Sequence, residues 1–445
     1  MIEAAFVVFG VVALLLFRFI APVRAAAVTC FAGWLLLPVG NFPPGSTDVA
    51  MPYWITGAAV PSDMLLTKAW WPPVVALAGA LWVDRKTLAY WRPRWIDAPM
   101  ALWCLWPIGQ WFVIDDAAPQ PWIASLYLFA TWGAPWLLGR LYFRNDDGGR
   151  RLIAAIVAGL GVITPIALIE SISGPKVYGW VYEHHPFTFD GDQRYLGFRP
   201  LGFFENGNQY GIWVAATALA AVWLWQSAPN SRTRGLVGIV ALLGLTIALM
   251  SQSVGAILLL CAGLVLSWAL GGQLTRWLLA LILLLMVLGG AIYLSGAVPL
   301  QALAKNTVIG QHLVHIIHSL GRGSFTWRIA RDQNALPLIA EHPMLGTARW
   351  DWWRPDNGRP WGLALLIIGQ FGLVGLVLAF GALLAPALRA LSIQWHPGAW
   401  QLHSALPLAI IILMAVGDAL LNSFFFYPAI LAAGSLASGE FNHLA

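Results

Sequence analysis

Charged residues are the scarcest class in this chain of 445 residues, at 10% of the total. Soluble globular domains contain about 25% charged residues, so most side chains here must face lipid or other apolar helices. Hydrophobic residues make up 59% of the chain, and the mean hydropathy is +0.71. The composition excludes a soluble domain of ordinary make-up and indicates a polytopic membrane protein.

Cysteine, nucleotide-binding loops and a cleavable leader are also scarce or missing. The three cysteines Cys30, Cys104 and Cys261 all lie in apolar runs, so we expect buried packing and neither disulfides nor a thiolate metal site. No Walker pattern occurs, and no GxGxxG follows a predicted strand. The first residues are acidic rather than basic, so we expect the first apolar run to be retained as a span.

Thirteen apolar runs divide the chain, at 3–20, 25–41, 69–83, 97–114, 122–139, 152–172, 209–226, 235–250, 254–270, 276–297, 361–385, 404–421 and 424–438. Lysine and arginine gather in every second gap, which predicts that those gaps are cytoplasmic and that the N-terminus is outside. An even number of spans remains an alternative if 3–20 or 424–438 is not a full span. The net charge of +5 therefore reflects topology and does not indicate a nucleic-acid partner.

The prediction is an all-α polytopic protein of the bacterial inner membrane, with about 12–13 transmembrane helices and two large periplasmic loops. The expected divisions are N-terminal transmembrane helices (1–172), a first long loop (173–208), central transmembrane helices (209–297), a second long loop (298–360) and C-terminal transmembrane helices (361–445). Because the predicted spans are almost free of charge, we expect function to reside in the two long loops.

The first long loop ends in a stretch dense in groups that bind anions or sugars. Arg194 and Arg199 carry planar guanidinium groups that match phosphate oxygens. Glu205, Asn208 and Gly202 lie nearby in sequence, and glycine allows the backbone to approach a ligand closely. The alternative is a solvated turn, because turns favour glycine and asparagine.

The second long loop is rich in arginine and tryptophan. Its candidate site residues are Arg328, Arg331, His342, Asp351 and Arg354. Its tryptophans are suited to anchoring at lipid headgroups or to stacking on sugars. Its histidines at 312, 315 and 318 are spaced by three, whereas a helical metal pair uses i and i+4, so we expect no metal site.

Together the loops predict an outward-facing cavity with many arginines, few carboxylates and an apolar floor. Such a cavity suits a ligand with a lipid tail and a diphosphate head, and arginine can neutralise the charge on a diphosphate leaving group. An outward site sees no ATP, so the energy must come with an activated lipid donor, and no cofactor is expected.

Four stretches resemble the O-antigen ligase and O-antigen polymerase superfamily. They are RPLGFFENGNQYG (199–211), LMSQSVGAILLL (249–260), WRIARDQNALPLIAEHPMLG (327–346) and GQFGLVGL (369–376). The hydropathy layout is similar over nearly the whole chain. The resemblance implies a GT-C-like architecture and periplasmic transfer from a polyprenyl-diphosphate-linked glycan to an acceptor glycan. Membrane lipids and other polysaccharide export proteins are further candidate partners.

The resemblance also implies roles for individual residues. Arg199 would bind the diphosphate, followed by Arg328 and then by Arg194 and Arg331, while Asn208 and Gly202 would shape the turn. The search set for a catalytic base is Glu205, His185, His342, Asp351 and Asp356. Where the ligase branch carries a His–Asn pair, this chain has Trp361 and Gly362, and its Ser–Arg turn reads Ser253–Val254.

These departures favour a polymerase of polysaccharide repeat units over a ligase. Transfer to lipid A core or to a protein remains the alternative within glycan transfer. A polysaccharide or lipid transporter is an alternative of another class, and a scaffold of an export complex is a third. Transporters usually place ionisable groups inside their spans, whereas here Asp418 is the clear exception, with Glu170 near a span end.

Overall fold

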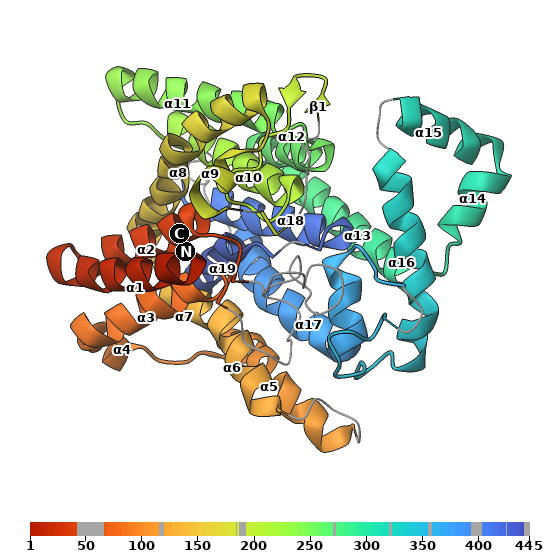
Figure 1. Cartoon of the computed structure of the whole chain (residues 1–445), viewed down its shortest axis with the longest axis horizontal. Helices are drawn as coiled ribbons and strands as arrows, with labels where there is room; N and C mark the ends of the chain where they lie inside the picture. Colours follow the sequence, from red (N-terminus) through yellow and green to blue (C-terminus); the bar gives the residue numbers. More distant parts are fainter. Residues whose placement is uncertain are drawn as a thin grey trace.

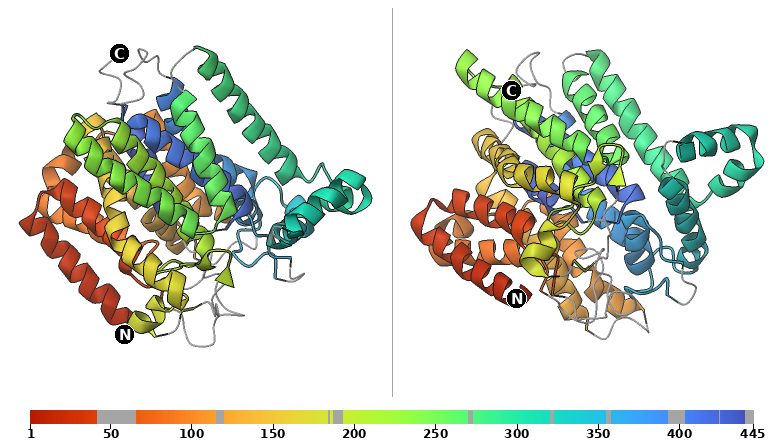
Figure 2. Two further views of the ribbon diagram at one scale, coloured as in Figure 1. Left: turned by 90° about the horizontal axis from the view of Figure 1, so that it is seen from above. Right: turned by 45° about the horizontal axis from the view of Figure 1, so that its top comes forward.

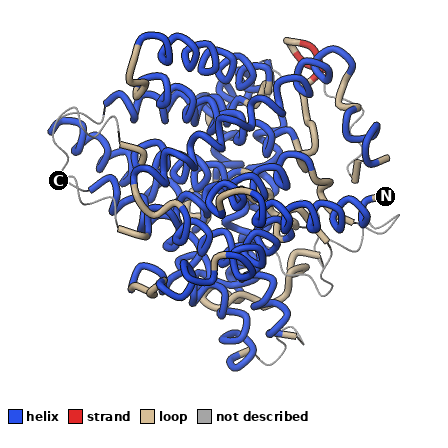
Figure 3. Tube along the Cα trace, turned by 90° about the vertical axis from the view of Figure 1, so that its left-hand side faces the viewer, coloured by secondary structure: helices blue, strands red, loops and turns tan. Residues whose placement is uncertain are grey.

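The fold is almost wholly helical, as predicted. The computed structural model describes residues 1–41, 66–114, 120–183, 185–186, 193–269, 273–319, 323–354, 358–392, 403–423 and 425–439. Within these ranges, the strands are confined to one short antiparallel hairpin, β1 (Gln193–Arg194) and β2 (Gly197–Phe198). Figure 3 shows this hairpin at an edge of the molecule.

The helices of the N-terminal half are α1 (Ile2–Phe19), α2 (Pro22–Leu36), α3 (Trp71–Val83), α4 (Arg85–Tyr90), the 3-10 turn η2 (Trp95–Asp97), α5 (Ala98–Val113), α6 (Pro121–Leu128), the π-helical turn η3 (Phe129–Gly133), α7 (Ala134–Tyr142), α8 (Asp146–Ser173) and α9 (Val177–Tyr182). Those of the C-terminal half are α10 (Gly207–Gln226), α11 (Ser231–Met250), α12 (Val254–Ala269), α13 (Gln273–Ser295), α14 (Leu300–Asn306), α15 (Val308–Ser319), α16 (Gly323–Glu341), α17 (Leu363–Ser392), α18 (Ala405–Leu421) and α19 (Tyr427–Ala437). Figure 1 labels most of them.

Several helices are suited to crossing a membrane. By length and composition, four of the described helices qualify, namely α1, α8, α11 and α17, or five if the bent pair formed by α13 and α14 counts as one span. Shorter apolar helices include α2, α3, α12, α18 and α19. The count of thirteen spans stays a prediction.

The centre of the bundle is formed by α10, α18 and α19 (Figure 1). Nearly every residue of α10 from Gly207 to Ala221 is buried, which is expected of a helix that is apolar on all sides and surrounded by others.

Helices α7 and α19 approach closely through small residues. A Cβ at Gly139 would lie 2.3 Å from the Leu431 carbonyl oxygen, so only glycine permits this backbone contact.

The helices α14, α15 and α16 lie beside the bundle, on the side opposite α1 and α2 (Figures 1 and 2). The first long loop emerges from one face of the bundle, here called the loop face, where α8 ends and α10 begins. Arg328 of the second long loop hydrogen-bonds Asn422 on this face. The turn between α11 and α12 and the connection between α18 and α19 lie on the same face, because they bond Arg199 of the first long loop and Gln209 at the start of α10.

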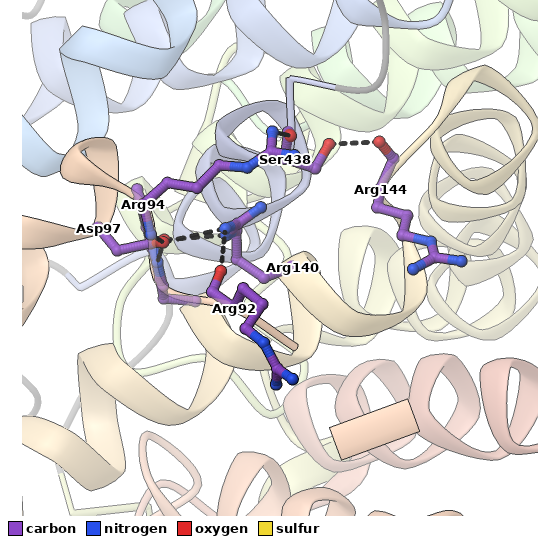
Figure 4. A network of polar contacts seen from close by, with 7 residues as sticks. Arg92, Arg94, Asp97, Arg140, Arg144 and Ser438 are labelled. Atoms are coloured by element: carbon purple, nitrogen blue, oxygen red, sulfur yellow. Dashed lines mark hydrogen bonds and ion pairs between the residues drawn. The ribbon is translucent and has the colours of Figure 1, made fainter. Parts of the chain in front are cut away.

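The opposite face, here called the basic face, carries a buried ion pair. Arg140 donates to both carboxylate oxygens of Asp97, at 2.9 Å each. The backbone N–H of Arg94 also donates to Asp97, and the Arg94 side chain donates to the Ser438 carbonyl oxygen. Figure 4 shows this network, which also joins Ser438 to the Arg144 carbonyl. It ties the start of α5 to α7 and to the end of α19.

Helix α17 is interrupted near its start. Gly372 has φ = 72°, a left-handed conformation that favours glycine, and a Cβ there would lie 2.1 Å from the Met344 carbonyl oxygen. The segment 343–348 runs beside the break and pairs with it, for example through the Thr347 N–H, which donates to the Gly369 carbonyl at 2.9 Å. The sequence pattern predicted a continuous span here and missed the break.

Candidate functional site

Arg199 is a buried side chain in the turn that precedes α10. Its Nε donates to the Ser251 carbonyl at 3.0 Å and its Nη2 to Asn208 Oδ1 at 2.9 Å. Gly207 makes room for it, since a Cβ there would lie 2.5 Å from the guanidinium carbon. The predicted residues Arg199 and Asn208 are therefore in direct contact, beside the turn between α11 and α12.

The side chain of Glu170, in α8, fixes the turn that carries Arg199. This buried carboxylate accepts the backbone N–H groups of Leu201 and Gly202, both at 2.7 Å, and that of Val177 at 3.1 Å. Gly202 adopts φ = 57°, which explains why the turn requires glycine at this position. Glu170 thus organises the first long loop, and this accounts for one of the two charges that the sequence placed in or near a span.

Lys68, from the connection between α2 and α3, binds one carbonyl group of the same turn and one near the end of α2. Its Nζ donates to the Phe203 carbonyl at 2.6 Å and to the Trp34 carbonyl at 3.1 Å. It also lies over the rings of Phe204 and Trp34, at 4.6 and 4.9 Å from their centroids. His185 Nε2 lies 3.0 Å from the Phe204 carbonyl oxygen. Nothing in the sequence near Lys68 indicated this role, because its partners lie up to 135 residues away.

Glu205 lies in this turn and is 1% exposed. Its backbone N–H donates to Gln209 Oε1 at 2.9 Å, and Gln209 Nε2 donates to the Phe425 carbonyl at 3.1 Å. Burial lowers the pKa of Lys68 to about 7, and the nearby Glu205 carboxylate opposes that shift. Glu205 and Lys68 therefore interact electrostatically inside the protein.

The hairpin of the first long loop brings Arg194 onto the turn between α11 and α12. Arg194 Nη1 donates to the Gln252 carbonyl at 3.4 Å, and the Gln252 side chain bonds the backbone of Leu196 and Gly197 at 3.3 Å each. Gln252 itself has φ = 50°. Arg194 and Arg199 thus contact consecutive residues, Gln252 and Ser251, of one turn.

Arg328 of α16 reaches the connection between α18 and α19. Its Nη1 donates to Asn422 Oδ1 at 2.7 Å, and Asn422 Nδ2 donates to Asp418 at 2.6 Å. Its guanidinium lies 5.4 Å from the centroid of Trp361. The Nε of Arg328 is buried and has no hydrogen-bond partner among the described residues.

The two long loops meet electrostatically at Arg328. Burial lowers the pKa of Arg328, the carboxylates of Asp418 and Asp332 oppose the shift, and the positive charge of Arg194 adds to it. Arg194 and Arg328 are 134 residues apart in sequence and come from different long loops. Arg328 bonds the same connection between α18 and α19 that Gln209 of α10 bonds, so the structure brings it to the face that holds the predicted residues Arg194, Arg199, Asn208, Gly202 and Glu205.

Asp332 fixes α16 to the start of α17. It accepts hydrogen bonds from the Tyr293 hydroxyl at 2.5 Å, from the Gly362 N–H at 3.1 Å and from the Trp361 N–H. Burial raises the pKa of Asp332, while these bonds and Arg328 oppose the rise. Trp361 and Gly362 thus serve as backbone donors to a carboxylate.

Arg359 is a further buried arginine that was not among the predicted site residues. Its Nη2 lies 3.3 Å from Ser423 Oγ, and its guanidinium lies 5.4 Å from the Trp361 centroid. Trp361 therefore contacts both Arg328 and Arg359. The connection between α18 and α19, which supplies Asn422 and Ser423, was read from the sequence only as a break between two apolar runs.

The remaining predicted residues take part in other contacts. Arg331 lies over Trp327 at 5.0 Å and Arg354 over Trp350 at 4.6 Å. Asp351 lies 3.5 Å from Arg349, and His342 is exposed at the end of α16. Among the described residues, no hydrogen bond or ion pair joins His342, Asp351 or Arg354 to Arg194, Arg199 or Arg328. Asp356 and the histidine side chain at 318 lie outside the described residues.

No group of three His, Cys, Asp or Glu side chains within the described ranges is arranged to hold a metal ion. No known family model and no curated protein sequence matches this chain.

Proposed function

We propose that this protein transfers glycan from a polyprenyl-diphosphate-linked donor at the periplasmic face of the bacterial inner membrane, polymerising polysaccharide repeat units. One observation carries the proposal: arginines of both long loops end on neighbouring turns of the loop face, Arg194 and Arg199 on the turn between α11 and α12 and Arg328 on the connection between α18 and α19. The positive charge of Arg194 also acts on Arg328. Bringing like charges together is unfavourable in the empty protein, and a polyanion such as a diphosphate would relieve that cost.

In the proposed reaction, a hydroxyl of the acceptor glycan attacks the anomeric carbon of the donor's first sugar. The bond from that carbon to the diphosphate oxygen breaks, and polyprenyl diphosphate leaves with the electron pair. Arg199 and Arg328 stabilise the negative charge that develops on the leaving oxygen. The proton of the hydroxyl passes to a base, for which Glu205 is the candidate closest in sequence to Arg199.

Ligation to lipid A core or protein is the second form of the same chemistry. The segment 361–362 supports polymerisation, because its backbone is committed to Asp332 and it carries no histidine to activate a lipid A core acceptor. Transport is the alternative of another class. It would use ionisable groups inside the spans, for which Glu170 and Asp418 are the candidates. Both accept hydrogen bonds from nearby groups of the protein, which supports a structural role for each.

The test compares host strains that lack the gene and are restored with wild type, Arg199→Ala, Arg328→Ala or Arg349→Ala. Arg349 is a matched control, because its side chain is 63% exposed in the second long loop. We expect glycans limited to one repeat unit in the deletion, Arg199→Ala and Arg328→Ala strains, and long chains with Arg349→Ala. With purified protein and lipid-linked donor, removing either Arg199 or Arg328 should lower kcat about 100-fold or more.

Other outcomes separate the alternatives. Long chains that accumulate on the lipid carrier in the deletion strain would indicate a ligase. Unpolymerised units that remain on the cytoplasmic side would indicate a transporter. Normal surface glycan in the deletion strain would refute glycan transfer altogether.

A further inference from the structure

Helix α15 exposes two chemically different faces. Ile309, Leu313 and Ile316 follow one another at intervals of four and three residues, so they share one face of the helix. Their exposed fractions are 74%, 53% and 41%. Gln311 and His315 are four residues apart, are also exposed, and lie on another face. A helix with one exposed apolar face and one polar face is suited to the boundary between lipid and water.

Helix α13 leads from the bundle to this exposed segment. It has 23 residues, enough to cross the hydrocarbon core of a bilayer, and α14 follows it at a bend of 88°. Helices α14 and α15 then project beside the bundle (Figures 1 and 2). A segment that leaves a span at nearly a right angle and lies beside the bundle has the surface of the surrounding lipid next to it.

The exposed side chains of α13 support lipid as the neighbour. They form an apolar stripe at helical intervals of three and four residues: Leu281, Leu284, Leu288 and Ile292. A stripe of this kind on a span is suited to lipid acyl chains. The apolar surface of α13 therefore continues through the bend toward the apolar face of α15.

Helices α14 and α15 are joined closely to each other. The Gln311 N–H donates to the Thr307 carbonyl at 2.9 Å, and Gln311 Nε2 donates to the Lys305 carbonyl at 2.7 Å. A Cβ at Gly310 would lie 2.2 Å from the Leu303 carbonyl oxygen, so glycine is required where the two helices meet. We call the pair α14 and α15 the arm.

The arm is also bonded to α16, the helix that carries Arg328. The Gln301 N–H donates to Gln333 Oε1 at 3.0 Å, and Gln301 Nε2 donates to the Ala330 carbonyl at 2.8 Å. Gln333 Nε2 donates in turn to the Val298 carbonyl, in the bend, at 3.1 Å. The depth of the arm therefore influences the depth of Arg328.

We propose that the arm lies in the interface of the membrane beside the bundle, with Ile309, Leu313 and Ile316 among the acyl chains and Gln311 and His315 toward water. Interfacial helices bury their apolar face about 5–10 Å into the boundary between headgroups and acyl chains. The partner is lipid rather than a second copy of the chain, because the apolar stripe of α13 leads into the arm. This membrane contact does not depend on glycan transfer.

The consequence for activity rests on the proposed function. An arm fixed in the interface holds α16, and with it Arg328, at the depth of lipid headgroups. The diphosphate of a polyprenyl-linked donor lies at that depth, since its lipid tail occupies the hydrocarbon core.

Spin labels at single cysteines test the position of the arm. The full-length protein is reconstituted in vesicles of phosphatidylethanolamine and phosphatidylglycerol. The background variant is Cys261→Ala, because Cys261 is exposed whereas Cys30 and Cys104 are buried. For each label, collision rates are measured with oxygen, which concentrates among acyl chains, and with a water-soluble nickel chelate.

Labels at Leu313→Cys and Ile316→Cys report on the apolar face, and labels at Gln311→Cys and His315→Cys are the matched positions on the polar face. We expect the ratio of oxygen to nickel collisions to be several-fold higher on the apolar face. Nickel-dominated collisions at all four positions would place the arm in water and overturn the proposal. Low collision rates with both reagents on the apolar face would mean that protein covers it, which also overturns the proposal.

A pair of charge variants tests the consequence for activity. Leu313→Glu places a carboxylate on the apolar face, whereas His315→Glu places the same charge on the polar face. We expect Leu313→Glu to abolish the oxygen preference of a label at Ile316→Cys and to raise KM for the lipid-linked donor several-fold, while His315→Glu changes neither. An equal KM for the two variants, with the oxygen preference lost only in Leu313→Glu, would leave the arm in the membrane and contradict its link to Arg328. Wild type without transfer activity would overturn the proposed function, and the collision rates would still decide where the arm lies.

Discussion

At the scale of single residues, the site depends on glycines that leave room for neighbouring side chains. A Cβ at Gly207 would lie 2.5 Å from the Arg199 guanidinium carbon, and a Cβ at Gly211 would lie 2.5 Å from the Ser253 Cβ. At Gly207 the neighbouring group is the end of the flexible Arg199 side chain rather than the backbone. A methyl group there would therefore displace the guanidinium without disrupting α10, in which alanine is favoured over glycine.

We therefore expect Gly207→Ala to weaken donor binding while leaving the fold intact. Displacement of Arg199 from Asn208 should raise KM for the lipid-linked donor about tenfold, which corresponds to about 1.4 kcal/mol, with no fall in Tm. Gly235→Ala in α11 is the control, because a Cβ there meets nothing within 4 Å. An unchanged KM in Gly207→Ala would argue against Arg199 as the diphosphate ligand.

The sequence predicted these residues unevenly. Arg199 was predicted because arginine beside a span is suited to phosphate, and Arg328 was implied by the family resemblance of the second long loop. Lys68, Asn422 and Ser423 were missed, because each contacts a partner in a distant segment. Asn422, for example, bonds Arg328, which is 94 residues away. Apolar periodicity carries no information about such pairs.

At the scale of elements, the broken helix α17 shows how the bundle satisfies an interrupted backbone. Gln110 of α5 donates to the Leu345 carbonyl at 2.6 Å and to the Gln370 carbonyl at 2.8 Å. Trp106, one turn earlier, donates to the Phe371 carbonyl at 2.8 Å. In an apolar environment, carbonyls freed by a helix break need such donors.

Replacing Gln110 by leucine removes both donors to the break. Each carbonyl left without a partner costs about 1–3 kcal/mol, so we expect Gln110→Leu to lower the Tm of the purified protein in detergent. The adjacent Trp111→Leu is the matched control, because Trp111 is 46% exposed. Equal Tm values for the two variants would mean that the break is satisfied without Gln110.

The long apolar helices could be predicted from the sequence. A single segment that crosses lipid must satisfy its own backbone hydrogen bonds, and a helix does so. The break at Gly372 and the short hairpin β1–β2 were not, since both depend on a second segment. The segment 343–348 supplies the pairing at the break, and the turn between α11 and α12 supplies the contacts of the hairpin.

At the scale of the whole molecule, the proposed function requires the loop face to be periplasmic. Asn41 bonds Glu3 at 2.7 Å, so the N-terminus lies on the same side as the α2–α3 connection and the Lys68 contacts. The basic face holds Arg94, Arg140 and Arg144 (Figure 4). Arginine gathered in short loops at span ends predicts that this face is cytoplasmic, whereas long loops such as the two on the loop face largely escape the charge bias.

Two exposed positions test this orientation in intact cells. Arg349 lies in the second long loop with its side chain 63% exposed, and Asp147 lies at the start of α8 with its side chain 69% exposed. The native Cys30 and Cys104 are buried, whereas Cys261 is exposed and would be replaced by alanine. We expect a membrane-impermeant maleimide to label Arg349→Cys directly and Asp147→Cys only after the membrane is permeabilised. The reverse pattern would place the arginine site in the cytoplasm, where a donor already transferred to the periplasmic leaflet cannot reach it, and the proposed function would then fail whatever the site can bind.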